Sequence, residues 1–209
     1  LEPADGALLN TTSTLVSVRA PLGTSAVTIN GTVATRAADG VSFTADVAVR
    51  SGDNPVAAIA YPFGQTATAN LVGDFRAPRL LASIPEDRVT TANAEIFLAG
   101  FFDEAARVSV ESPAGTVSAS TRFDLARSNQ LFGSEVHRFD VAALPLLAGS
   151  NPITVRARDA AGNETAYALT VERRSGALQL VSPAAGSSVA DLVTSVTLRA
   201  SETVTVDAW

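Results

Sequence analysis

The sequence predicts an all-β protein made of tandem β-sandwich domains, the last of them incomplete. Three observations support this prediction: runs in which apolar and polar residues alternate, a hairpin signature that occurs twice, and short motifs that recur in the same order. Alternation with a period of two places one face of a strand against a core. Many short strands with turn residues between them favour a sandwich over a βαβ fold.

The hairpin signature is clearest at residues 146–171, LLAGSNPITVRARDAAGNETAYALTV. From Ile153 to Arg158, apolar residues alternate with Thr and Arg, as expected of a strand that lies over a core. Residues 159–163, DAAGN, then interrupt the alternation with residue types that suit turns. A counterpart, RSGDNPVAAIAYPFGQTATANL, occupies residues 50–71 and indicates a tandem array.

Short motifs recur along the chain in a constant order, which is the signature of a repeat architecture. The matched stretches are 1–6 with 181–186, 16–20 with 196–200 and 27–30 with 204–207, and a looser middle copy comprises 84–87, 96–100 and 108–111. We therefore expect sandwiches at 1–78 (domain 1) and 79–175 (domain 2), and the N-terminal part of a third at 176–209 (domain 3). Domain 2 carries an extra stretch at 112–136.

The expected strands follow from the alternating runs and the turn residues that bound them. In domain 1 they are 13–20, 26–35, 41–49, 55–61 and 66–73; in domain 2 they are 80–84, 94–100, 106–111, 116–123, 137–142, 153–158 and 165–172. A brief helical turn is expected only at 142–147. The linkers at 74–78 and 173–176 are so short that neighbouring domains should touch and the angle between them should be restrained.

Domain 3 would have only two or three strands, too few to close a core, and its unpaired edges would be exposed. We expect the chain to continue in a longer protein; the alternative is that another segment completes the sheet. The single tryptophan, Trp209, is expected to fill the missing part of this domain.

Composition and charge exclude several classes of function. The net charge of −6 opposes binding to nucleic acid and to anionic membrane surfaces. No apolar run is long enough to insert in a membrane as a helix. The absence of cysteine excludes disulfides and thiol chemistry. All 15 Lys and Arg residues are arginine, which with the alanine and glycine content is typical of a GC-rich bacterial genome.

Several motifs together resemble a known group of domains. They are a Pro-x-x-Gly opening, a Val-x-Val/Ile-Asn/Asp strand, a Phe-x-x-x-Val strand, Gly-x-Asn-Pro and Asp-Ala-Ala-Gly-Asn. This pattern is similar to bacterial immunoglobulin-like modules, in particular the glucodextranase-B-like type found in tandem in secreted proteins. Domain 1 departs from it at residues 61–65, YPFGQ, where the last motif should stand. The resemblance implies spacers in adhesins, surface proteins and polysaccharide-degrading enzymes, and fold alone does not decide among these.

A calcium site is the only cofactor that the residues suggest, and no other cofactor is expected. Asp159, Asn163 and Glu164 gather oxygen ligands around one turn, but they lack the spacing of an EF-hand loop. The alternative is a turn that Asp159 and Asn163 hold through bonds to their own backbone. Two further acidic pairs, at 86–87 and 103–104, could approach a domain junction or be solvated loop charge.

Aromatic residues near turns are the candidates for ligand binding. Tyr61 and Phe63 flank a proline at the expected tip of the domain 1 hairpin, where a sugar ring could stack on them. Phe101 and Phe102 could act in the same way in domain 2. The alternative for all four is packing against a core or a domain junction.

No catalytic arrangement is predicted. His137 is the only histidine, expected to face outward on a strand, and a zinc site would need more ligands of its kind. A serine hydrolase would have to use His137, and the sequence has no Gly-x-Ser-x-Gly before a helix. Paired carboxylates for glycoside hydrolysis stay open in principle, but a small sandwich offers no substrate cleft.

Three hypotheses of function remain. The first is a non-catalytic stalk, spacer or filament unit of a larger bacterial extracellular or cell-surface protein, whose partners are other domains of the same or neighbouring chains. The second is a carbohydrate-binding accessory module of a secreted polysaccharide-active enzyme. The third is self-assembly, in which a neighbouring chain supplies a strand to domain 3.

Overall fold

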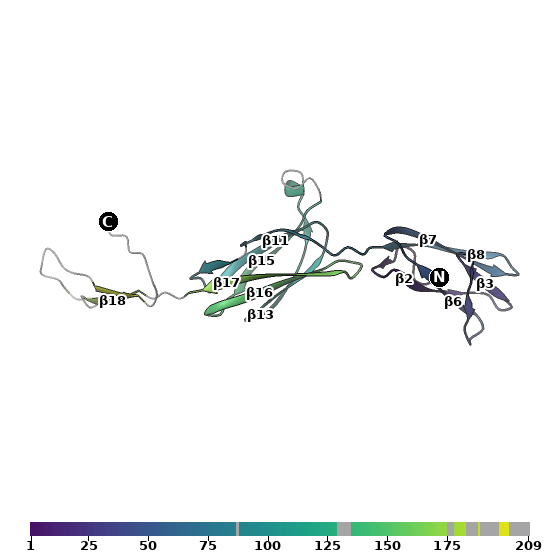
Figure 1. Ribbon diagram of the computed structural model, residues 1–209, viewed down its shortest axis with the longest axis horizontal. Coiled ribbons are helices and arrows are strands. Elements are labelled where there is room, and N and C mark those ends of the chain that lie inside the picture. The colour runs from purple at the N-terminus through teal and green to yellow at the C-terminus, as the bar shows by residue number, and fades with distance from the viewer. Residues whose placement is uncertain (87, 129–134, 175–177, 183–187, 189–196, 201–209) are drawn as a thin grey trace.

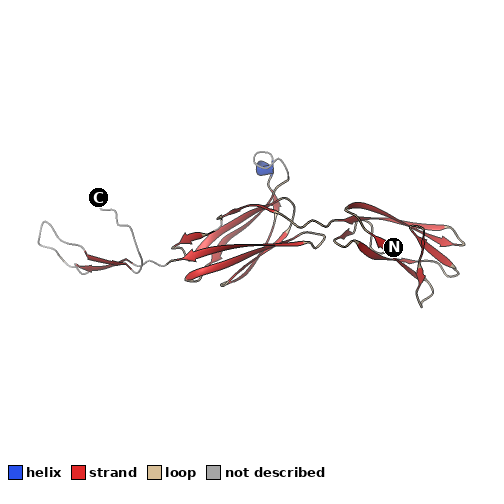
Figure 2. Ribbon diagram, in the orientation of Figure 1, coloured by secondary structure: helices blue, strands red, loops and turns tan. Residues whose placement is uncertain are grey.

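A computed structural model describes residues 1–86, 88–128, 135–174, 178–182, 188 and 197–200. The described residues form two β-sandwiches that lie end to end and a separate two-stranded sheet (Figures 1 and 2). The all-β prediction is confirmed, because the helix in the described part is the three-residue α1 (Leu125–Arg127).

Domain 1 consists of a five-stranded and a three-stranded sheet, ordered β1-β8-β7-β3-β4 and β2-β6-β5. The strands are β1 (Leu8–Leu9), β2 (Ser13–Arg19), β3 (Ala26–Ile29), β4 (Thr32–Val33), β5 (Thr35–Arg36), β6 (Ser42–Ala48), β7 (Gly52–Tyr61) and β8 (Gln65–Gly73). Neighbouring strands are antiparallel except β1, which pairs in parallel with the end of β8.

Domain 2 consists of a five-stranded and a four-stranded sheet, ordered β10-β17-β16-β12-β13 and β14-β15-β11-β9. The strands are β9 (Leu80–Ile84), β10 (Val89–Thr91), β11 (Glu95–Phe102), β12 (Arg107–Ser112), β13 (Gly115–Ser120), β14 (Arg122–Phe123), β15 (His137–Pro145), β16 (Gly149–Arg158) and β17 (Glu164–Arg173). Strand β10 again pairs in parallel with the end of the last strand, β17.

The two domains match strand for strand, with one exception. The five-stranded sheets correspond in order, and β14, β15 and β11 correspond to β5, β6 and β2. Strand β9 has no counterpart strand in domain 1. This one-to-one topology explains the motifs that recur between domains 1 and 2, whereas the matched stretches at 181–186 and 204–207 lie largely outside the described residues.

Each sandwich encloses its own core of alternating apolar residues. The domain 1 core is built of small and β-branched residues around Phe43 and Leu71. The domain 2 core is built around Phe102 and Phe139, both at most 1% exposed. At one end of this core the backbone N–H of Leu80 donates to Tyr167 Oη at 2.8 Å. Because the cores are separate, each domain buries its own apolar surface.

The Gly-x-Asn-Pro motif forms the same structure in both domains. In domain 2 the N–H of Leu147 donates to Asn151 Oδ1 at 2.8 Å, and Asn151 Nδ2 donates to the carbonyls of Leu147 at 2.8 Å and Gly149 at 2.9 Å. Asn54 makes the equivalent three bonds in domain 1. The asparagine therefore satisfies backbone groups at the turn that enters the long hairpin.

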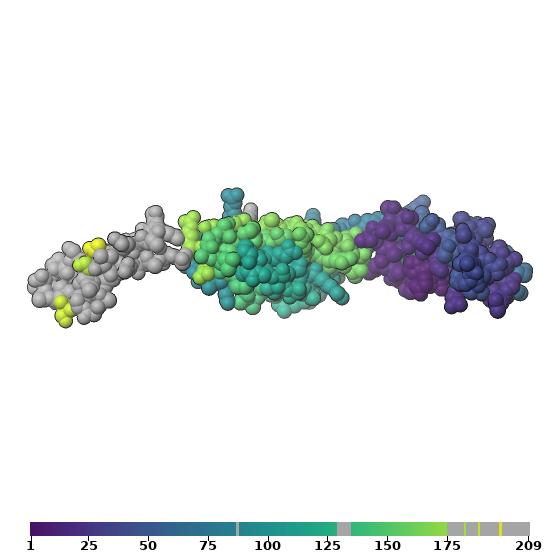
Figure 3. All heavy atoms as spheres, turned by 90° about the horizontal axis from the view of Figure 1, so that it is seen from below, coloured from purple at the N-terminus to yellow at the C-terminus, as the bar shows by residue number. Residues whose placement is uncertain are grey.

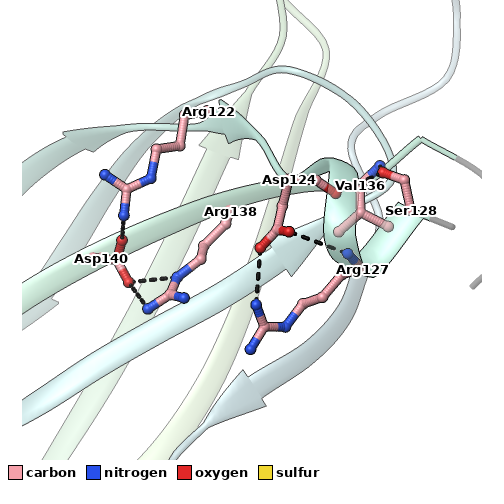
Figure 4. Close-up of polar contacts among 7 residues, drawn as sticks. All are labelled: Arg122, Asp124, Arg127, Ser128, Val136, Arg138 and Asp140. Carbon is pink, nitrogen blue, oxygen red and sulfur yellow. Dashed lines mark hydrogen bonds and ion pairs between the residues drawn. The ribbon is translucent and has the colours of Figure 1, made fainter. Parts of the chain in front are cut away.

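The described part of the extra stretch covers the face of β11 and β15 that points away from the core. Phe101 lies on that face, with the Arg127 guanidinium 4.6 Å and the Arg138 guanidinium 5.7 Å from its ring centroid. Asp124 caps α1 by accepting from the N–H of Arg127 at 3.1 Å, and its other carboxylate oxygen accepts from the Arg127 side chain at 2.9 Å. Arg122 and Arg138 both pair with Asp140, as Figure 4 shows. Arg127 and Arg138 thus lie over the buried ring of Phe101.

Some local expectations were wrong. Residues 142–147 do not form a helical turn, because β15 continues through Pro145, and the short helix lies instead at Leu125–Arg127. The expected strand 26–35 is divided by a turn at Asn30 and Gly31, which both have positive φ. The parallel strands β1 and β10 were not predicted, because two or three residues are too few to show a period.

For domain 3 the structure describes one antiparallel pair, β18 (Leu178–Ser182) with β19 (Thr197–Ala200). The role expected of Trp209 and the completion of this domain lie outside the described residues.

Candidate functional site at the domain junction

Domain 2 binds the backbone of the linker that joins it to domain 1. The tip of the β16–β17 hairpin places Asn163 beside the linker, where its Nδ2 donates to the carbonyls of Asp74 at 2.9 Å and Arg76 at 3.3 Å. On the domain 1 side, the N–H of Asp74 donates to the carbonyl of Leu9. The linker is therefore attached to both sandwiches, and the space-filling view shows their atoms in contact (Figure 3).

A second set of contacts fixes the linker as it enters β9. The N–H of Arg79 donates to Asp103 Oδ1 at 2.8 Å, and the N–H of Asp103 donates back to the carbonyl of Arg79 at 3.2 Å. The guanidinium groups of Arg76 and Arg79 lie 3.6 and 3.7 Å from Asp103 Oδ2. Both arginine side chains are largely exposed, so these ion pairs contribute little, whereas the two backbone bonds fix the chain.

Three carboxylates converge at this junction, one each from the linker, from the loop after β11 and from the hairpin tip. One oxygen each from Asp74, Glu104 and Asp159 lies within 4.8 Å of the others. Asp159 also holds the hairpin turn, because its Oδ1 accepts from the N–H groups of Gly162 and Asn163 at 2.7 and 2.9 Å. Among the described residues this is the one group of three or more acidic or histidine side chains close enough to share a cation.

Glu104 is the electrostatically strained member of this cluster. Burial, followed by the negative charges of Asp74, Asp159 and Asp103, raises the pKa of its carboxyl to about 7, and the nearby Arg76 opposes this only in part. Glu104 Oε1 is buried without a hydrogen-bond partner. The cluster therefore favours a counter-charge, and either a proton on Glu104 or a hard cation such as calcium could supply it.

The expected calcium ligands are separated by the fold. Asp159 belongs to the acidic cluster, but Asn163 directs its amide nitrogen to the linker, and Glu164 pairs with Arg156 at 3.4 Å on the sheet surface. The turn that Asp159 and Asn163 hold through backbone bonds is present. Sequence reasoning missed Asp74 entirely, and it included Glu104 only as half of an acidic pair that could approach a junction.

Of the four aromatic candidates, two are exposed and two are buried. Tyr61 and Phe63 are 44% and 54% exposed at the tip of β7–β8, the end of domain 1 away from the linker. Leu22, 84% exposed, is on the loop whose Gly23 lies against the Phe63 ring. Phe101 and Phe102 are 3% and 0% exposed, so the expectation that they form a ligand-binding surface is wrong. The alternation of β11 places Phe102 in the core, and arginines cover Phe101.

The His137 ring packs beside Phe123, with ring centroids 5.7 Å apart. Among the described residues, no helix is long and apolar enough to cross a membrane.

No known family model matches the chain, and no curated protein is significantly similar to it. Among solved structures it is similar to the fibronectin(III)-like modules of CbhA from Clostridium thermocellum, with 15% identity and a TM-score of 0.48 over 83% of this chain and 93% of that one. It is also similar to an I-band fragment of titin, with 16% identity and a TM-score of 0.47 over 81% and 62%. With TM-scores this low, these similarities carry no further argument. Its own sheets show a tandem of immunoglobulin-like β-sandwich domains.

Proposed function

We propose that this chain is a non-catalytic spacer segment of a larger bacterial extracellular or cell-surface protein, in which it keeps neighbouring domains at a restrained distance and angle. The observation that carries this proposal is the bonding of the linker backbone by Asn163 of the hairpin tip. A free linker of this length would let two domains pivot, because interfaces between domains of one chain are usually small. Bonds from domain 2 to the Asp74 and Arg76 carbonyls remove that freedom.

The composition is compatible with an extracellular setting. The chain has no lysine and no cysteine, a net charge of −6, and domains of the kind that tandem bacterial surface proteins use. Because the cores are separate, each domain can fold without the other, and further domains can be added in tandem without changes to the existing ones. The partners proposed are accordingly other domains of the same or neighbouring chains.

Spin labels on the two domains test the proposal directly. The chain lacks cysteine, so Thr68→Cys on β8 and Ser118→Cys on β13, both exposed, give one label per domain. A narrow distribution of distances is expected in the natural background and a broad one in Asn163→Ala. Asn30→Ala is the matched control, because Asn30 also bonds backbone groups but lies within domain 1. A broad distribution in the natural background rejects a fixed junction.

A second candidate function is glycan or protein recognition by the free tip of domain 1. Tyr61, Phe63 and Leu22 are exposed there together, and exposed aromatics on a rigid hairpin suit stacking on a sugar ring. A glycan array read with the natural chain and with Tyr61→Ala/Phe63→Ala tests this candidate. Binding that the double variant loses supports it, and binding that the variant retains assigns recognition to another surface.

A further inference from the structure

Domain 2 has an edge strand that domain 1 lacks. Strand β9 pairs antiparallel with β11, with Ala99 opposite Ile84, Phe101 opposite Ala82 and Phe102 opposite Leu80. In domain 1 the strand equivalent to β11 is β2, and its outer edge carries a single bridge, between Glu2 and Ser17. In both domains the bridged residue directly precedes a proline, so Glu2 corresponds to Ile84 and Ser17 to Ala99.

The edge of β2 beyond this bridge has no partner in domain 1, all of whose residues are described. Ser17 exchanges both its backbone bonds with Glu2, and alternate residues of a strand face the same neighbour. The N–H and C=O of Arg19 therefore face the side that β9 occupies in domain 2. The N–H of Ala20 points the other way, to the carbonyl of Val41.

The core of domain 1 is also open at this end. A hollow of about 100 Å³ lies beside Val18 and Ala20, with Ala67 on its far wall. In domain 2, Phe102 occupies the position equivalent to Ala20, and Tyr167 occupies the position equivalent to Ala67. The second match follows from register, since Ala67 pairs with Ala58, three residues after Pro55, and Tyr167 pairs with Val155, three residues after Pro152.

In domain 2 a leucine from the edge strand closes the same region. Leu80 packs against the domain 2 core, and its Cδ1 lies 3.1 Å from the point where a Cβ on Gly100 would be. Its N–H is bound by Tyr167. The edge strand therefore both completes the sheet and covers the end of the core.

We propose that the Val18–Arg19 edge of β2 and the hollow beside it bind an extended segment that runs back from Leu1, antiparallel to β2, and places a leucine-sized side chain in the hollow. Two observations select this occupant. Residues 1 and 2 already lie against β2, so the same strand continued backwards meets the open edge. Strand β9 approaches β11 in that direction and carries Leu80 at the equivalent point. This is strand addition in cis, with backbone bonds for affinity and an apolar side chain for register.

The test adds the missing strand to the full chain. A copy of residues 76–82, RAPRLLA, fused directly ahead of Leu1 would place its second alanine opposite Arg19 and the copy of Leu80 opposite Ala20. Amide hydrogen exchange in residues 16–20 is expected to slow by about tenfold or more, and the melting temperature of domain 1 to rise by about 4–8 °C. The matched control is the same prefix with aspartate at the copy of Leu80, which is expected to give neither effect.

Three results would overturn the proposal. The first is no protection and no shift with the RAPRLLA prefix. The second is an equal gain from the aspartate prefix, which would deny the hollow any role. The third is protection by a free RAPRLLA peptide in excess but not by the fused prefix, which would make the occupant a separate chain.

Discussion

Replacing Asn151 by alanine should destabilise domain 2 more than almost any other change of a polar side chain. The residue is fully buried and makes three bonds, to the N–H and C=O of Leu147 and to the C=O of Gly149. A net 0.5–1.5 kcal/mol per bond, and a larger cost for backbone groups left unpaired, give a loss of about 2–4 kcal/mol. For a domain of this size that loss lowers the melting temperature by about 10–25 °C.

Asn54 provides the comparison, because at a half-buried position in domain 1 it makes the equivalent three bonds and a longer fourth one, 3.4 Å, to the carbonyl of Leu71. Water can replace part of what Asn54→Ala removes, so the expected loss is about 1–2 kcal/mol. Calorimetry of the full chain, with each transition assigned by hydrogen exchange of its domain, measures both effects. The idea that Asn151 stabilises domain 2 by hydrogen bonding buried backbone groups would be refuted by equal losses in the two variants, or by a loss below about 1 kcal/mol for Asn151→Ala.

Three further predictions concern domain 2 and its junction. The pKa of Glu104 is raised to about 7 from an ordinary 4.5, so protonated Glu104 stabilises the folded state fully below about pH 4.5, and this contribution is lost as the pH rises through 7. The free energy of unfolding should therefore fall by about 1–2 kcal/mol between pH 5 and 8, as measured by urea unfolding. In Glu104→Gln the free energy of unfolding should vary less with pH over this range. Calcium chloride at pH 8 should raise the melting temperature of the natural chain and leave Asp74→Asn/Glu104→Gln unchanged; an identical melting temperature with and without calcium rejects the metal hypothesis. Gly100→Ala should cost about 1–3 kcal/mol in denaturant unfolding, because its Cβ would lie 2.2 Å from the buried Phe139 ring; a neutral effect would show that this ring can move.

The sequence predicted the strands well wherever a period of two ran for five residues or more. The alternation from Ile153 to Arg158 is buried and exposed in the expected order, and the DAAGN turn follows it. Alternation did not predict burial where a residue on the outer face of a sheet is covered by other side chains. Phe101 and Phe102 are adjacent, so alternation places Phe102 in the core and Phe101 on the outer face, where Arg127 of the extra stretch and Arg138 of β15 lie over its ring.

The junction could be predicted only in outline. Short linkers indicated contact between domains, and Asp159 was recognised as part of an oxygen-rich turn. The acidic cluster, however, joins residues from the linker, a loop and a hairpin that are far apart in sequence. Their meeting depends on how the hairpin tip of domain 2 faces the end of domain 1, and a linear pattern carries no information about that relation. The raised pKa of Glu104 is equally a product of this convergence.

The parallel pairing of β1 with β8, and of β10 with β17, determines how the array would respond to tension. Pulling on the two ends of the polypeptide draws β1 and β8 in opposite directions along their common axis, so their inter-strand bonds are loaded in shear and must break together rather than in succession. The same holds for β10 and β17, which share three paired positions where β1 and β8 share two. Of these two domains, domain 1 would thus unfold first under a stretching force, and domain 2 would stay folded to a higher force.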